Sequence, residues 1–100
     1  MNQVDLIVEH RDAIKAACAK YGATAVRVFG SCARDEYDEK SDIDVLVQLP
    51  PGLDAFAWAR RLGDMEEDLQ VLLGVPVDVI DESSLKGRAR ERILSEAVAL

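Results

Sequence analysis

The sequence predicts a mixed α+β (α/β) fold, in which a three-stranded mixed sheet carries helices packed on one face. Segments with a three- to four-residue apolar repeat alternate with short strand-like segments, in the order α-β-α-β-α-β-α. A long helical segment links the second and third strands, which favours a parallel pair, whereas the short link between the first and second favours an antiparallel pair. The length of 100 residues fits a single domain, residues 1–100, with one small core.

The first helix is predicted at residues 2–20, because apolar side chains recur there at three- and four-residue steps. They are Val4, Ile7, Val8, Ile14, Cys18 and Tyr21. Gly22 should end this helix. A short strand follows at residues 24–29 and is bounded by Gly22 and Gly30.

The second strand, residues 42–49, is the most regular segment of the chain. A short helix at residues 31–37, capped by Ser31, and a polar turn are expected to precede it. Successive side chains of a strand alternate between faces. One face should therefore carry Ile43, Val45, Val47 and Leu49, and the other Asp42, Asp44, Leu46 and Gln48.

A long helix is predicted at residues 54–73, after the break at Pro50-Pro51-Gly52. Its apolar stripe consists of Trp58, Leu62, Met65, Leu69 and Leu72. Gly74 should end the helix. The third strand follows at residues 75–80, with Asp78 on the face opposite Val77 and Val79.

The last helix should begin at a cap formed by Ser83 or Ser84. Its core side is predicted to be Leu85, Ala89, Ile93, Ala97 and Leu100. Four basic residues surround its first turns: Lys86, Arg88, Arg90 and Arg92. They either form a solvated face or serve a nucleotide or partner, since cations near a helix start oppose its dipole.

The composition excludes several classes of protein. The formal net charge of -7 disfavours direct nucleic-acid binding, which depends on clustered Lys and Arg. No apolar run approaches the ~18 residues of a membrane span, and the N-terminus does not resemble a signal peptide. Two cysteines, Cys18 and Cys32, are too few for a disulfide framework, so both are expected to be reduced thiols. These features indicate a cytoplasmic protein.

Asp42 and Asp44 are the leading candidates for catalytic metal ligands. They lie two positions apart on one strand, so both carboxylates point to the same side. Mg²⁺ prefers carboxylate, water and phosphate oxygens, and a pair of such ions can stabilise the attacking and leaving oxygens of a phosphoryl displacement. The acidic pair alone is weak evidence in a chain with 19 acids, but these two open an otherwise apolar strand. The alternative is a pair of solvated carboxylates at the sheet edge.

Gly30 and Ser31 are the candidate phosphate binders, because their turn ends the first strand and can meet Asp42 and Asp44 at one end of the sheet. Glycine lets the backbone approach a phosphate closely, and the Ser31 hydroxyl and the amides after it can donate to it. Arg34 can add a phosphate contact or form a surface ion pair instead. Asp78 on the adjacent strand can act as a third ligand or accept the proton of the nucleophile. The alternative is an outward acid on an edge strand.

The string Phe29-Gly30-Ser31, followed after ten residues by Asp42-Ile43-Asp44, resembles the signature of the DNA polymerase beta superfamily of nucleotidyltransferases. The fuller strings Phe-Gly-Ser-Cys-Ala-Arg and Ser-Asp-Ile-Asp-Val-Leu-Val resemble its minimal, MNT-type members, which are typically the antitoxins of HEPN/MNT toxin-antitoxin pairs. The resemblance covers nearly the whole chain, including Asp78. It implies a nucleotidyltransferase palm-like core.

The resemblance also implies an activity, namely Mg²⁺-dependent transfer of AMP from ATP to a hydroxyl, in the antitoxins a tyrosine of the HEPN toxin. By matched position, Asp42 and Asp44 would be metal ligands, and Asp78 the third carboxylate and candidate general base. Gly30 and Ser31 would hold the triphosphate. Family members usually have glycine where this chain has Asp35. Two alternatives remain open: transfer to a small hydroxylated molecule, and a non-catalytic antitoxin that binds and masks its toxin.

Overall fold

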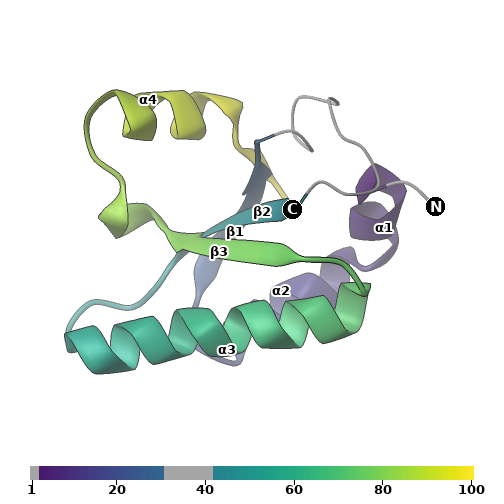
Figure 1. Ribbon diagram of the computed structural model, residues 1–100, viewed down its shortest axis with the longest axis horizontal. Coiled ribbons are helices and arrows are strands. Elements are labelled where there is room, and N and C mark those ends of the chain that lie inside the picture. The colour runs from purple at the N-terminus through teal and green to yellow at the C-terminus, as the bar shows by residue number, and fades with distance from the viewer. Residues whose placement is uncertain (1–2, 31–41) are drawn as a thin grey trace.

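The computed structural model describes residues 3–30 and 42–100 (Figure 1). The elements are α1 (Gln3–Glu9), α2 (Arg11–Ala19), β1 (Thr24–Phe29), β2 (Ile43–Gln48), α3 (Ala55–Leu73), β3 (Val77–Asp81), the 3-10 turn η1 (Glu82–Ser84), α4 (Gly87–Glu96) and β4 (Val98–Ala99). The short helix predicted at residues 31–37 lies outside the described residues.

The sheet has the strand order β3-β2-β1-β4. As predicted, β1 and β2 are antiparallel, and β2 and β3 are parallel across the crossover that contains α3. The predicted count of three strands was wrong by one, because the C-terminal residues Val98 and Ala99 pair with Val28 and Arg27 of β1. A two-residue strand has no measurable alternation, so the sequence pattern could not reveal it.

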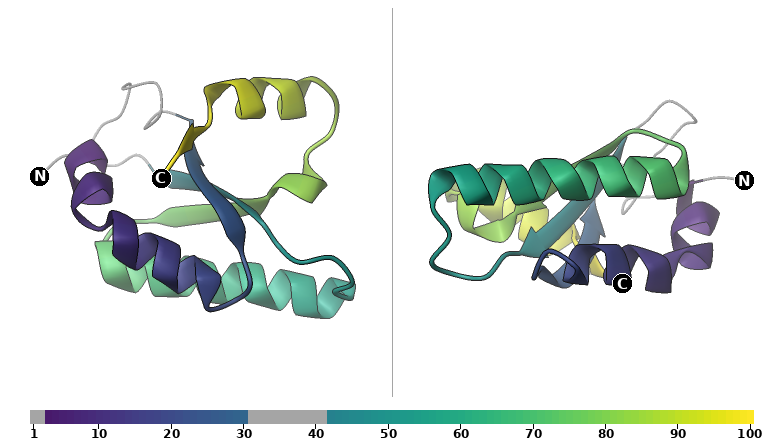
Figure 2. Two further views of the ribbon diagram at one scale, coloured as in Figure 1. Left: turned by 180° about the vertical axis from the view of Figure 1, so that it is seen from behind. Right: turned by 90° about the horizontal axis from the view of Figure 1, so that it is seen from below.

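The main core lies between the sheet and helices α1, α2 and α3 (Figure 2). Ile14, Met65 and Leu69 reach it from the helices and are at most 1% exposed. The strands contribute Val26, Val28, Ile43, Val45, Val47, Val77 and Val79. The predicted alternation along β2 is therefore confirmed.

The prediction that all helices share one face was wrong for α4, which covers the opposite face (Figure 1). Ile93 of α4 packs there against Phe29 and Leu46. Leu85, Leu94 and Ala97 are partly buried beside them, whereas Ala89 is exposed. Phe29 and Leu46 are apolar side chains on the face of the carboxylates, and α4 shields them from water.

The N-terminal segment forms two helices instead of the single predicted one. The break is at His10, whose backbone has φ -103 and ψ 14 and whose Nδ1 lies 2.9 Å from the carbonyl oxygen of Leu6. Ile7 and Ile14 nevertheless both reach the main core. The apolar repeat continues through the break, so periodicity could not locate it.

The long helix α3 has the predicted ends. The Asp54 carboxylate accepts a hydrogen bond from Ala57 N at 2.7 Å, and Gly74 closes the helix with a left-handed φ of 71°.

The predicted serine cap of the last helix was wrong. Asp81 caps η1 instead, and α4 starts after Lys86 without a side-chain cap.

Cys18 is fully buried and free of any disulfide, as expected, and burial raises the pKa of its thiol to about 11. Cys32 lies outside the described residues.

Across residues 3–30 and 42–100, none of the helices is both long and apolar enough to cross a bilayer.

Candidate active site

The candidate catalytic carboxylates meet at one end of the sheet. Asp44 of β2 is paired in register with Phe29 of β1 on one side and with Asp78 of β3 on the other. Neighbouring strands are about 4.8 Å apart, so Asp44 and Asp78 are adjacent positions. Asp42 precedes β2 directly, where Ile43 N donates to the Pro76 carbonyl oxygen at 3.0 Å. This bond joins the start of β2 to the entry of β3.

Strand alternation places these carboxylates on the face opposite the main core. Val77 and Val79 flank Asp78 and lie in that core, so Asp78 faces the other way. Asp44 is half-buried, whereas Asp42 and Asp78 are exposed. The predicted pairing of Asp78 with the acidic strand therefore agrees with the observed register, and its carboxylate is accessible to a ligand.

Gly30 lies directly beside Asp44. Its φ of +74° is a conformation that L side chains rarely adopt, and a Cβ at this position would overlap Asp44 Oδ2 and lie 3.3 Å from Asp44 Cγ. Glycine is thus required by both the backbone and the close approach of the carboxylate. The turn that leaves β1 therefore passes next to the acidic strand, as the sequence predicts.

The other predicted phosphate-binding residues, Ser31 and Arg34, lie outside the described residues, as does Asp35. Gly30 and Asp42 are the two ends of this segment. Of these two described residues, Gly30 lies beside Asp44, and Asp42 is itself one of the candidate carboxylates.

The chemistry of the donor set fits a hard divalent cation. Asp42, Asp44 and Asp78 supply only oxygen ligands, which suit Mg²⁺. No group of three His, Cys, Asp or Glu side chains within residues 3–30 and 42–100 is converged enough to form a ready-made metal site. Mg²⁺ commonly binds through one or two carboxylates and completes its shell with water and substrate phosphates, which is consistent with an open arrangement.

Asp81, a buried carboxylate at the far end of β3, was not predicted from the sequence. It accepts hydrogen bonds from Trp58 Nε1 at 2.7 Å and Ser83 Oγ at 2.8 Å. Burial raises the pKa of Asp81, but the bonds from Trp58, Ser83 and Leu49 N outweigh it and leave that pKa below its ordinary value. An acid at a strand end before Glu-Ser-Ser is a recognisable capping signal, and it indicates a structural role.

A second polar cluster joins η1 to the sheet and to α4. Glu82 lies 3.8 Å from Arg27 and 3.5 Å from Arg90, and it also accepts a hydrogen bond from Gln48. Arg90 therefore forms an ion pair within the chain. The remaining basic residues of this region, Lys86, Arg88 and Arg92, are exposed.

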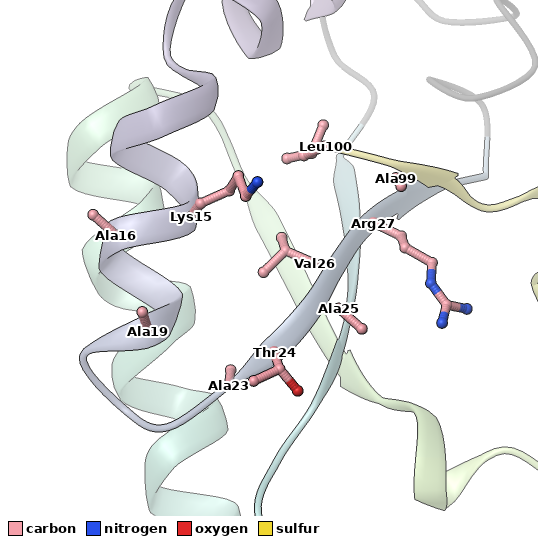
Figure 3. Close-up of a pocket in the computed structure, with 10 residues that line it drawn as sticks. All are labelled: Lys15, Ala16, Ala19, Ala23, Thr24, Ala25, Val26, Arg27, Ala99 and Leu100. Carbon is pink, nitrogen blue, oxygen red and sulfur yellow. The ribbon is translucent and has the colours of Figure 1, made fainter.

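The hollow drawn in Figure 3 is separate from the carboxylates. It has a volume of about 530 Å³ and lies between α2, β1 and the C-terminal residues Ala99 and Leu100. Half of its lining residues are alanine, and none has a carboxylate side chain. It therefore does not belong to the candidate active site.

Comparison with known proteins identifies the family. The sequence pattern of the Nucleotidyltransferase domain family matches residues 10–100. A Methanocaldococcus jannaschii protein, provisionally named protein adenylyltransferase MJ0435, is 39% identical over 79% of this chain and 81% of its own length. Protein adenylyltransferase MntA of Thermococcus cleftensis is 38% identical over 79% of this chain and 76% of its own.

Solved structures show the same fold. One is provisionally described as a minimal nucleotidyltransferase; it is 40% identical and superposes with a TM-score of 0.80 over 99% of this chain and 97% of its own. A toxin-antitoxin structure with AMP-PNP has a TM-score of 0.64 at 22% identity, over 98% of this chain and 72% of the other, which is a likeness of fold. The chain therefore belongs to the nucleotidyltransferase domain family and is an enzyme of the minimal nucleotidyltransferase type.

Proposed function

We propose that this protein is a Mg²⁺-dependent protein adenylyltransferase that moves AMP from ATP to a hydroxyl group of a HEPN-type toxin and so acts as its antitoxin. Tyrosine is the expected acceptor, and the cytoplasm, which contains both ATP and Mg²⁺, is the expected location. The observation that carries the proposal is the register that aligns Asp44 with Asp78 and sets Gly30 beside Asp44.

In this proposal each residue has a distinct task. Asp42 and Asp44 would hold Mg²⁺, and Asp78 would either complete the ligand set or accept the proton of the acceptor hydroxyl. Bound Mg²⁺ would neutralise the triphosphate and the charge that develops on the attacking and leaving oxygens. Gly30 leaves room for phosphate at the end of β1, where Ser31 and Arg34 would donate to it. The acceptor oxygen bonds to the α-phosphorus, and pyrophosphate leaves.

The relatives support a protein as the acceptor. Two of them, at 38–39% identity, bear the name protein adenylyltransferase, and the fold recurs in a toxin-antitoxin structure with a bound nucleotide analogue. The exposure of Asp78 at the edge strand β3 leaves that side of the site open to a large substrate. We further propose that residues 1–100 form one catalytic domain whose acceptor site is completed by the partner.

The test is to incubate the protein with its candidate toxin, ATP and Mg²⁺ and to weigh both proteins by intact mass spectrometry. The toxin should gain one or more units of about 329 Da, and the gain should require a divalent ion. The variant Asp42→Asn/Asp44→Asn should abolish it. The control variant Glu9→Gln/Asp12→Asn removes two exposed acids from the N-terminal helices and should transfer AMP normally.

Two outcomes would overturn the proposal. If a tight complex forms with no change in mass, and the aspartate variant still rescues cells from the toxin, the protein masks its toxin instead. If AMP is transferred only to small hydroxylated molecules, the acceptor class is wrong although the chemistry is right.

A further inference from the structure

The face of α3 that points away from the sheet carries an exposed stripe that the proposed reaction does not use. We call the outer stripe the residues Phe56, Arg60, Gly63, Glu67 and Val71, which recur at three- and four-residue steps and are all exposed. Phe56 is 76% exposed and Val71 is 82% exposed. Figures 1 and 2 show α3 at the margin of the fold, with this side uncovered by any other described element.

Gly63, at the middle of the outer stripe, is not required by a close contact with any described residue or by a left-handed backbone. A Cβ at this position would meet nothing within 4 Å, and glycine in a helix interior is less stable than alanine. A shallow hollow of about 380 Å³ lies beside it, lined by Gly63, Glu66, Glu67, Gln70 and Val71. A missing side chain lets another helix approach closely, because the distance between two helix axes depends on the side chains at their crossing.

The stripe is complementary to itself. Phe56 and Val71 are equally far from the midpoint between Gly63 and Asp64, and so are Arg60 and Glu67. If two copies of α3 pack antiparallel across that midpoint, each Phe56 faces Val71 of the second copy beside the hollow. Each Arg60 then faces Glu67 of the second copy. A two-fold interface must be complementary to itself, since both partners use the same patch of residues.

We propose that the outer stripe is a homodimer interface, in which α3 of one copy packs antiparallel on α3 of a second copy around Gly63. Arg60 lies 3.9 Å from Asp64 in a well-exposed ion pair, so its guanidinium can also reach a second acid. Arg60 and Glu67 are about 10 Å apart along their own helix and do not pair within one chain. The interface is restricted to one helix, which fits a weak, concentration-dependent dimer.

The dimer leaves both active sites accessible. α3 covers the main core, whereas Asp44 and Asp78 lie on the opposite face of the sheet. Dimerisation through the outer stripe is therefore independent of the proposed reaction.

Sedimentation equilibrium over a wide range of protein concentration tests this inference. The wild-type chain should show a monomer-dimer equilibrium. Arg60→Glu and Glu67→Arg should each raise the dimer dissociation constant by at least about 10-fold, because each creates two like-charge pairs across the interface. The double variant Arg60→Glu/Glu67→Arg should return to within about threefold of wild type, because it swaps the charges on both sides.

Arg92→Glu is the matched control, since it makes the same charge change at an exposed site on α4 and should leave the equilibrium unchanged. Circular dichroism verifies that every variant is folded. A wild-type chain that stays monomeric at several hundred micromolar would overturn the inference. Failure of the folded double variant to regain dimerisation would also overturn it.

Discussion

The two faces of the sheet have very different construction. Among residues 3–30 and 42–100, the face under α1, α2 and α3 gathers 14 buried residues into one core, whereas the face under α4 has three, Phe29, Leu46 and Ile93. The second face also carries the carboxylates at its open end. The difference indicates that the two faces have separate roles. The face under α1, α2 and α3 provides most of the stability, and the face under α4 leaves room for a substrate.

A single strand contributes side chains to both faces of the sheet. In β2, Val45 is 1% exposed and packs in the main core, while its neighbour Asp44 faces the opposite way. Alternation along a strand makes this possible without any irregularity in the backbone. Substitutions one position apart should therefore change different properties of the protein.

The largest expected effect is loss of catalysis on the carboxylate face. Asp44→Asn should lower AMP transfer by about 1,000-fold or more, roughly 4 kcal/mol in activation free energy, because it removes a negative ligand of Mg²⁺. Urea denaturation should show a free energy of unfolding within about 1 kcal/mol of wild type. Activity retained in a folded Asp44→Asn protein would remove this residue from the mechanism.

The next effect is loss of stability on the core face. Leu69 is fully buried, so Leu69→Ala should reduce the free energy of unfolding by about 3 kcal/mol through lost burial and a cavity. Asp78→Asn, at an exposed position of the opposite face, should change it by about 0.5 kcal/mol or less. Equal losses in the two variants would contradict the division between the faces. Urea titrations of both proteins measure this difference.

Gly30→Ala should reduce both AMP transfer and stability, because Gly30 lies where the backbone turn meets Asp44. Its positive φ and the overlap with Asp44 Oδ2 predict a loss of about 1 to 3 kcal/mol in unfolding free energy, together with reduced AMP transfer. Gly52→Ala is the matched control, since Gly52 has φ +86° but no atom within 4 Å of the position that a Cβ would take. It should lose less stability and keep its activity. Identical behaviour of the two variants would show that the contact with Asp44 is unimportant.

The smallest expected effect concerns Asp81 and pH. Its folded-state pKa is lowered, so the stability that it contributes is present above the unfolded value near 3.8 and is lost as pH falls through the folded pKa. Asp81→Asn should therefore be less stable than wild type at neutral pH, by about 1 kcal/mol, and the difference should shrink below pH 4. Thermal unfolding between pH 7 and pH 3 measures it. A constant difference across this range would contradict the assignment.

Regular periodicity predicted most of the fold. The strand at residues 43–48 and the helix at residues 55–73 agree with prediction, because each contains several repeats of its pattern and the helix ends in recognisable caps. The break at His10 and the strand Val98–Ala99 were missed. The strand Val98–Ala99 depends on its pairing with β1, which the local sequence does not encode. The break at His10 was missed because the apolar repeat continues through it.

Only part of the candidate site was predicted from the sequence. The sequence pattern predicted that Gly30 lies next to Asp44 and that Asp78 shares its face, and the register agrees with both. The pattern did not reveal Asp81, whose burial depends on Trp58 in a distant helix, or the position of α4 on the carboxylate face. Long-range packing decides the burial of Asp81 and the position of α4. The capping signal of Asp81 before Glu-Ser-Ser reports only the start of η1.

We expect the carboxylate end of the sheet to bind nucleotide together with Mg²⁺. Isothermal titration calorimetry with an ATP analogue that has a methylene group between the α- and β-phosphorus tests it without any partner protein. We expect binding that requires Mg²⁺ and is weakened at least about 100-fold in Asp42→Asn/Asp44→Asn, while Glu9→Gln/Asp12→Asn binds like wild type. Binding that is independent of Mg²⁺, or equal in the two variants, would contradict it.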